Sequence, residues 1–137
     1  MKTEVNKTAS EHWQEVIPHR EDVLLEDMDI FKNYLVLSER YNGLNRIRIM
    51  SWDNQEDYYL PFDNETYTAY TGTNPDFDTN ILRYGYNSLT TPASVIDFDM
   101  KTKESEVKKE QEVQDPNFNK ENYLSERIWA TAQDGTK

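Results

Sequence analysis

Short runs of β-branched and aromatic residues, separated by clusters of turn-forming residues, dominate the hydrophobic pattern of this chain. In residues 46–50, RIRIM, Ile47 and Ile49 would share one face of an extended chain, while Arg46 and Arg48 would share the other. This two-residue alternation and the length of the runs predict β-strands. The predicted strands are residues 34–37, 46–50, 57–60, 66–72, 81–86 and 94–99.

The charged segment at residues 102–113, TKESEVKKEQEV, allows two interpretations. Its Glu and Lys residues have the spacing of ion pairs on a helix. The alternation of Ser105, Val107 and Lys109 equally suits an exposed edge strand. Because the segment follows a series of predicted strands, we favour the strand.

An internal repeat organises the predicted strands. YNGL at residues 41–44 recurs 45 residues later as YNSL at residues 86–89, and both copies have the same order of strands and turns around it. A four-stranded antiparallel unit that repeats every ~40–50 residues is typical of a β-propeller blade. We therefore predict an all-β fold with two four-stranded antiparallel blades, at residues 22–61 and 62–113.

The two ends of the chain are predicted to extend this array. Residues 1–21 contain HWQEVIP at 12–18, which we interpret as the outer strand of a preceding blade. Residues 114–137 are predicted to be a linker with an exit strand at 127–132, followed by a hairpin turn at Asp134-Gly135. Propellers close with about four to eight blades, and a second hairpin strand would need more than two further residues. We therefore expect the chain to be part of a longer protein.

Composition narrows the possible partners. The formal net charge of −11 disfavours nucleic acid as a partner, because phosphate binding requires clustered Lys and Arg. The sequence has no apolar run long enough to form a signal peptide or to cross a membrane, so no membrane partner is expected. The absence of cysteine excludes disulfides, zinc fingers and thiol catalysis.

No constellation of catalytic residues can be recognised. The only histidines are His12 and His19, and the sequence has neither a G-x-S-x-G motif nor a glycine-rich phosphate loop. Asp76, Asp78 and Asn80 begin like a calcium loop, but the glycine and glutamate that such a loop needs later are absent. We expect no catalytic, cofactor-binding or metal-binding residue in this chain.

Three segments resemble one family. They are IPHREDVLLEDMDIFKNYLVLSERYNGLNRIRI, YNSLTTPASVIDFDM and NYLSERIWATAQDGTK. Together they are similar to the prolyl oligopeptidase family of serine peptidases, in its oligopeptidase B (protease II) branch. The resemblance extends from about Trp13 onward. It implies that the chain holds the last blades of a seven-bladed propeller and the exit into an α/β-hydrolase domain.

The resemblance also implies a function. Members of the family cleave short peptides with a Ser, Asp and His triad that lies beyond the segment matched here, and this branch cuts after Arg or Lys. The chain would then be non-catalytic and form part of the lid that restricts access to the active site. Its implied partners are short peptide substrates and its own catalytic domain. The expected location is the cytoplasm, with the periplasm as the alternative.

Three further hypotheses remain open. Glu126 and Arg127, just before the exit strand, are candidate hinge residues that form ion pairs between domains, although ordinary surface pairing explains them equally well. Exposed blade faces would allow the chain to associate with itself. The alternative function is a propeller-type protein-binding scaffold without peptidase activity.

Overall fold

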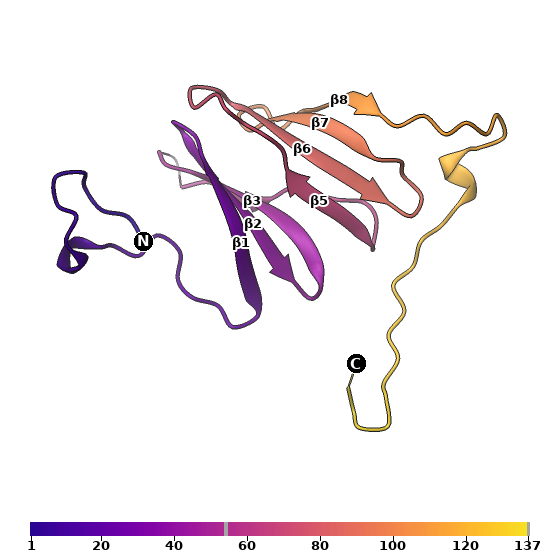
Figure 1. Ribbon diagram of the computed structural model, residues 1–137, viewed down its shortest axis with the longest axis horizontal. Helices are drawn as coiled ribbons and strands as arrows, with labels where there is room; N and C mark the ends of the chain where they lie inside the picture. Colours follow the sequence, from indigo (N-terminus) through magenta and orange to yellow (C-terminus); the bar gives the residue numbers. More distant parts are fainter. Residues whose placement is uncertain (54, 137) are drawn as a thin grey trace.

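The computed structural model describes residues 1–53 and 55–136 and contains two four-stranded antiparallel sheets (Figure 1). Within each sheet the strands follow the order of the chain. The first sheet consists of β1 (Val23–Ile30), β2 (Tyr34–Tyr41), β3 (Leu44–Ser51) and β4 (Asp57–Tyr59). The second consists of β5 (Tyr67–Thr71), β6 (Ile81–Ser88), β7 (Ser94–Asp99) and β8 (Ser105–Glu110). The predicted all-β fold with two four-stranded units is confirmed.

The segment with two interpretations forms a strand. All six residues of β8 are exposed, and β8 pairs with β7 at the edge of the second sheet. Its charged side chains, Glu106, Lys108, Lys109 and Glu110, are suited to an edge, because they discourage pairing with another chain. The edge-strand interpretation of residues 102–113 is therefore confirmed over Ser105–Glu110.

A single hydrophobic core lies between the two sheets, which Figure 1 shows one beside the other. Alternate residues of β2 and β3 face this core, so their side chains meet those of β6 and β7. The core residues are Phe31, Tyr34, Val36, Ile47, Ile49 and Leu60 from the first half, and Ala69, Leu82, Tyr84, Phe98 and Met100 from the second. Each sheet therefore depends on the other to bury its apolar face.

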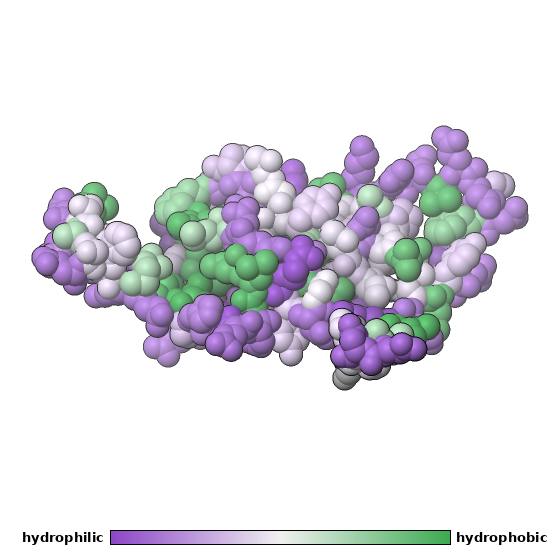
Figure 2. All heavy atoms as spheres, turned by 60° about the horizontal axis from the view of Figure 1, so that its bottom comes forward, coloured by the Kyte–Doolittle hydropathy of each residue, from purple (hydrophilic) through white to green (hydrophobic). Residues whose placement is uncertain are grey.

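The first sheet has a second apolar face, opposite the core, which we call the free face. Leu35 and Leu37 of β2 are buried there, whereas Leu25, Met28 and Ile30 of β1 are about half exposed. Figure 2 shows hydrophobic side chains gathered on one side of the molecule next to the N-terminal segment. Such a surface suits contact with another sheet. Self-association of the chain through it stays a prediction.

The two ends differ from the sequence-based expectation. Residues 12–18, expected to be an outer strand, form no strand; a 3₁₀ turn (Ser10–His12) and a single bridge between Lys2 and Gln14 lie there instead. Residues 127–132 also form no strand and follow an elongated path (Figure 1). A strand needs a neighbour that pairs with it over several residues. Among the described residues, 12–18 has only the Lys2–Gln14 bridge, and 127–132 has no bridge to another strand.

The turn at the C-terminal end is as predicted. The Gly135 N–H donates to the carbonyl of Ala132 at 2.9 Å, and the Ala132 N–H donates to the carbonyl of Thr136 at 2.8 Å. Gly135 has φ +86°, which glycine adopts at little steric cost. The Asp134 carboxylate accepts from the Thr136 N–H and so stabilises the turn.

Candidate functional site

The candidate hinge residues Glu126 and Arg127 lie in residues 114–136, which we call the arm. The arm leaves the second sheet after β8 and runs past the ends of the strands (Figure 1). The backbone N–H of Arg127 donates to Glu65 Oε2 at 3.0 Å, and its guanidinium Nη2 donates to the backbone carbonyl of Asn42. Asn42 belongs to the turn between β2 and β3, and Glu65 to the connection between the sheets. Arg127 therefore ties the arm to the β2–β3 turn and to the connection between the sheets.

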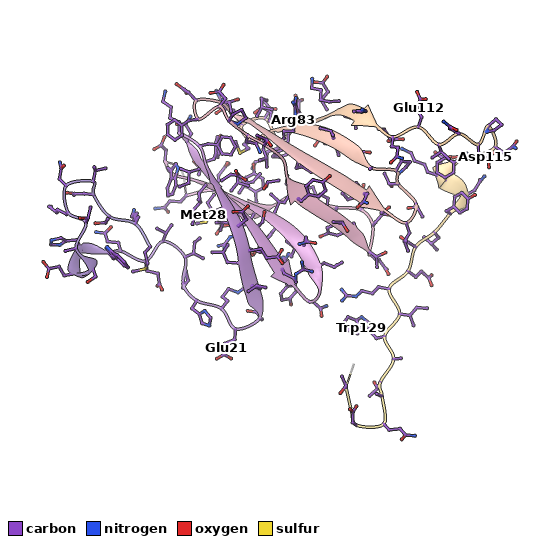
Figure 3. All side chains as sticks on the ribbon, viewed as in Figure 1. Glu21, Met28, Arg83, Glu112, Asp115 and Trp129 are labelled. Atoms are coloured by element: carbon purple, nitrogen blue, oxygen red, sulfur yellow. The ribbon has the colours of Figure 1, made fainter. Side chains whose placement is uncertain are left out.

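The side chain of Arg127 also packs on the arm itself. Its guanidinium carbon lies 4.3 Å from the centre of the Trp129 ring, within the range of a cation–π contact. Trp129 is about half exposed, and Ile128 on the opposite side of the chain is 84% exposed. Figure 3 places Trp129 on the arm, beyond the ends of the strands. The arm thus offers apolar side chains to whatever adjoins it.

Glu126 has a different environment from its neighbour. It is exposed and lines a shallow groove with residues at the start of β5 and the end of β6, among them Tyr67 and Ser88. The carboxylate that contacts Arg127 comes from Glu65, which the sequence analysis did not identify. Because Glu65 is 62 residues away, no local pattern could have indicated it. Ion pairing of Glu126 and Arg127 across a domain hinge stays a prediction.

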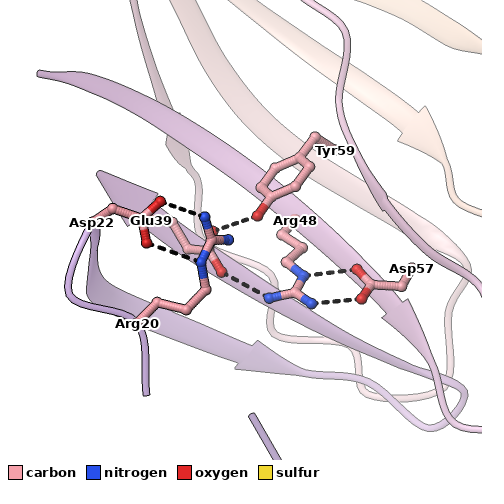
Figure 4. Close-up of polar contacts among 6 residues, drawn as sticks. All are labelled: Arg20, Asp22, Glu39, Arg48, Asp57 and Tyr59. Atoms are coloured by element: carbon pink, nitrogen blue, oxygen red, sulfur yellow. Dashed lines mark hydrogen bonds and ion pairs between the residues drawn. The ribbon is translucent and has the colours of Figure 1, made fainter. Parts of the chain in front are cut away.

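A second polar cluster lies on the free face and consists of Glu39, Arg48, Asp57 and Tyr59 (Figure 4). Glu39 is only 2% exposed. Arg48 Nη1 lies 3.3 Å from Glu39 Oε1, and Arg48 Nε donates to Asp57 Oδ1 at 2.7 Å. The Tyr59 hydroxyl donates to Glu39 Oε2 at 2.9 Å. The buried carboxylate is therefore compensated by one cation and one hydroxyl.

Two arginines flank this cluster. Arg46 lies between two rings, 4.7 Å from the centre of Tyr41 and 4.0 Å from that of Tyr59. Arg20 pairs with Asp22 beside the cluster, at 2.7 Å between Nη2 and Oδ2 (Figure 4). The groups bind one another rather than converge on an open space. The cluster is therefore suited to stabilising the sheet and not to bond-making chemistry.

Ion pairing shifts the pKa values of carboxyl groups in this cluster and in the Arg83–Asp97 pair of the second sheet. Hydrogen bonds from Arg48 hold the pKa of Asp57 below its usual value, and hydrogen bonds from Arg83 do the same to the pKa of Asp97. Burial, reinforced by the hydrogen bond with Glu39, raises the pKa of Tyr59. All three directions favour the charge states present near neutral pH.

We expect the fold to weaken in acid. A carboxyl group whose pKa is lower in the folded than in the unfolded chain stabilises the fold above its unfolded pKa, which is 3.8 for Asp57 and Asp97. That stabilisation disappears as the pH falls through the folded pKa. The urea concentration at the unfolding midpoint should therefore decrease as the pH is lowered below about 4. In Asp57→Asn this decrease should be smaller, because one of the titrating carboxyl groups is gone. Equal wild-type midpoints at about pH 3 and pH 7 would contradict the prediction.

The described residues form no metal centre. No group of three or more His, Cys, Asp or Glu side chains is placed to hold a metal ion within residues 1–53 and 55–136. In the calcium-like run, the Asp78 carboxylate pairs with Lys32 at 2.7 Å. His12 lies 3.5 Å from Glu11. In the same described part of the chain, no helix is long and apolar enough to cross a membrane.

Comparison with known proteins gives consistent matches. The family described as prolyl oligopeptidase, N-terminal beta-propeller domain, matches residues 1–111. Dipeptidyl aminopeptidase BI of Pseudoxanthomonas mexicana is 35% identical over 130 residues, which are 95% of this chain and 18% of that protein.

Two solved structures also resemble this fold. Oligopeptidase B from Trypanosoma brucei, in a closed form with covalently bound antipain, matches with a TM-score of 0.76 at 33% identity. Oligopeptidase B from Leishmania major matches with a TM-score of 0.76 at 28% identity. Each comparison covers 88% of this chain and 18% of the solved chain. The chain thus spans less than a fifth of the length of the relatives it matches.

Proposed function

This chain belongs to the prolyl oligopeptidase family, in its N-terminal β-propeller domain, and we propose that it forms part of the substrate-gating propeller of a serine oligopeptidase. The proposed enzyme cleaves short peptides after Arg or Lys. The chain itself supplies no bond-making group and is joined to a separate catalytic domain. The family match over residues 1–111 is the observation that carries this proposal.

The shape of the fold supports a place in a larger propeller. The two sheets pack face to face around one core, as neighbouring blades do. The free face of the first sheet, with Met28 and Ile30 about half exposed, suits contact with a further blade. The end of the first sheet at the β2–β3 turn, which Arg127 of the arm contacts, would then lie toward the catalytic domain.

The proposed role is control of access. A propeller over an active site admits small, unstructured peptides and excludes folded proteins, and closure of the two domains removes water from the reacting groups. The oligopeptidase B of Trypanosoma brucei was solved in a closed form with covalently bound antipain. A net charge of −11 on this chain would attract basic peptides, which agrees with cleavage after Arg or Lys.

A peptidase assay tests the proposal. The substrates are two short fluorogenic peptides that differ only in Arg or Glu before the scissile bond. They are offered to this chain alone and to the whole protein that contains it. We expect the whole protein to cleave the Arg peptide and the chain alone to cleave neither. No cleavage by the whole protein would favour a binding scaffold, and cleavage by the chain alone would reveal a catalytic group outside the proposal.

A further inference from the structure

We propose that Arg127 is a latch that holds the arm against the first sheet and the connection between the sheets, and so sets the direction in which the chain leaves the propeller. Its guanidinium binds the Asn42 carbonyl, its backbone N–H binds Glu65, and its planar group covers the Trp129 ring. One residue therefore joins the first sheet, the connection between sheets and the arm. The inference depends only on the geometry of this chain and stands whether or not the peptidase assignment holds.

The turn that receives Arg127 is shaped for this contact. Asn42 and Gly43 both have positive φ, +50° and +78°, as in the tight hairpin turns whose twist matches that of the strands. A side chain at Gly43 would place its Cβ 3.2 Å from Arg127 Nη2, which is closer than an ordinary contact. Glycine therefore serves twice, by allowing the turn and by leaving room for the guanidinium.

The equivalent turn of the second repeat closes in another way. Tyr86-Asn87-Ser88 corresponds to Tyr41-Asn42-Gly43 at the 45-residue offset. There the Ser88 hydroxyl accepts hydrogen bonds from the N–H groups of Thr90 and Thr91, at 3.2 and 3.0 Å. The second turn is thus closed by hydrogen bonds to the side chain of its own Ser88, while the first turn presents the backbone carbonyl of Asn42 to Arg127 of the arm. The two copies of the repeat have diverged at the point where the arm crosses.

Arg127 is the stronger of the two polar ties described between the arm and the rest of the fold. The other is the ion pair of Lys120 with Glu110, at 3.8 Å between two half-exposed side chains. Exposed pairs of this kind contribute little, because solvent screens them. Arg127 is half-buried and donates from both its backbone and its side chain. Substitution of Arg127 removes its side-chain contacts with the Asn42 carbonyl and the Trp129 ring and keeps the backbone N–H that binds Glu65. It should therefore free this part of the arm from the first sheet, whereas loss of Lys120 should not.

Trp129 reports the state of the latch directly. In a background with Trp13→Phe and Trp52→Phe, acrylamide quenching measures the accessibility of Trp129 alone. We expect Arg127→Ala to raise the quenching constant measurably, up to about twofold because the ring is already 52% exposed, since the ring loses the guanidinium that covers it. The urea midpoint should stay near that of the background, because the core between the sheets is untouched. Lys120→Ala, which removes a cation from the same arm, should leave quenching unchanged.

Two further variants test the contact between Arg127 and the turn, one by changing the turn and the other by changing the arm. Gly43→Ala crowds the guanidinium and strains the φ +78° turn that presents the Asn42 carbonyl. It changes no residue of the arm and should also raise the quenching of Trp129. Arg127→Lys keeps the charge and the N–H but loses the planar stacking group, and should give an intermediate value. Unchanged quenching in Arg127→Ala, or an equal rise in Lys120→Ala, would overturn the latch. These readouts need no peptidase activity, so they are independent of the assay above.

Discussion

Replacement of Leu82 with Ala is expected to lower the free energy of unfolding by about 2–5 kcal/mol. Leu82 lies in β6, is fully buried and belongs to the core shared by both sheets. The smaller side chain would leave a cavity among residues that are themselves held by strand pairing, so the site could collapse only in part. Urea denaturation followed by circular dichroism measures the loss.

The same substitution tests whether the two sheets unfold as one unit. Trp52 follows β3 and donates from Nε1 to the carbonyl of Phe31, so its fluorescence reports on the first sheet. In a background with Trp13→Phe and Trp129→Phe, Leu82→Ala in the second sheet should shift the Trp52 transition as far as the circular dichroism transition. This coupling is expected because the core is one cluster.

The matched control is Leu89→Ala, which removes the same atoms from a residue that is 86% exposed. It should change the free energy of unfolding by no more than about 0.5 kcal/mol. A Trp52 transition that stays in place while the second sheet loses stability would show that the sheets unfold independently. That result would contradict the single core described here.

The strands were predictable where sequence alternation and burial agree. Residues 46–50 place Ile47 and Ile49 in the core and the intervening Arg48 on the free face, as their pattern indicates. The strand β1 is less evident, because Glu26, Asp27 and Asp29 interrupt its apolar residues. Its long exposed edge tolerates these carboxylates, and tertiary pairing with β2 decides its structure.

Whether a polar contact could be predicted depends on how far apart its two residues lie in the sequence. The Asn42-Gly43 turn fixes the register of β2 against β3, and with it the approach of Glu39 to Arg48 across one hairpin. That cluster could in principle have been inferred from the turn. The partners of Arg127 are 62 and 85 residues away and lie in loops, so only the packing of the two sheets brings them together.

The second large effect is expected at Arg48. The side chains of Arg48 and Glu39 are 15% and 3% exposed, so Arg48→Met would leave a buried carboxylate with the Tyr59 hydroxyl as its remaining described partner. Removal of one member of a buried pair costs about 3–5 kcal/mol, because the other charge has already lost its water. Urea denaturation at neutral pH measures this loss.

Two comparisons separate burial of Glu39 from the simple loss of a cation. Arg40→Met breaks the pair with Glu26, whose members are 46% and 27% exposed, and should cost no more than about 1 kcal/mol. The double variant Glu39→Gln/Arg48→Met removes the unpaired charge and should recover part of the stability lost in Arg48→Met. Equal losses in Arg48→Met and Arg40→Met, or no recovery in the double variant, would mean that the free face tolerates an unpaired Glu39. The pairing with Arg48 would then be a consequence of the register of β2 and β3 rather than a source of stability.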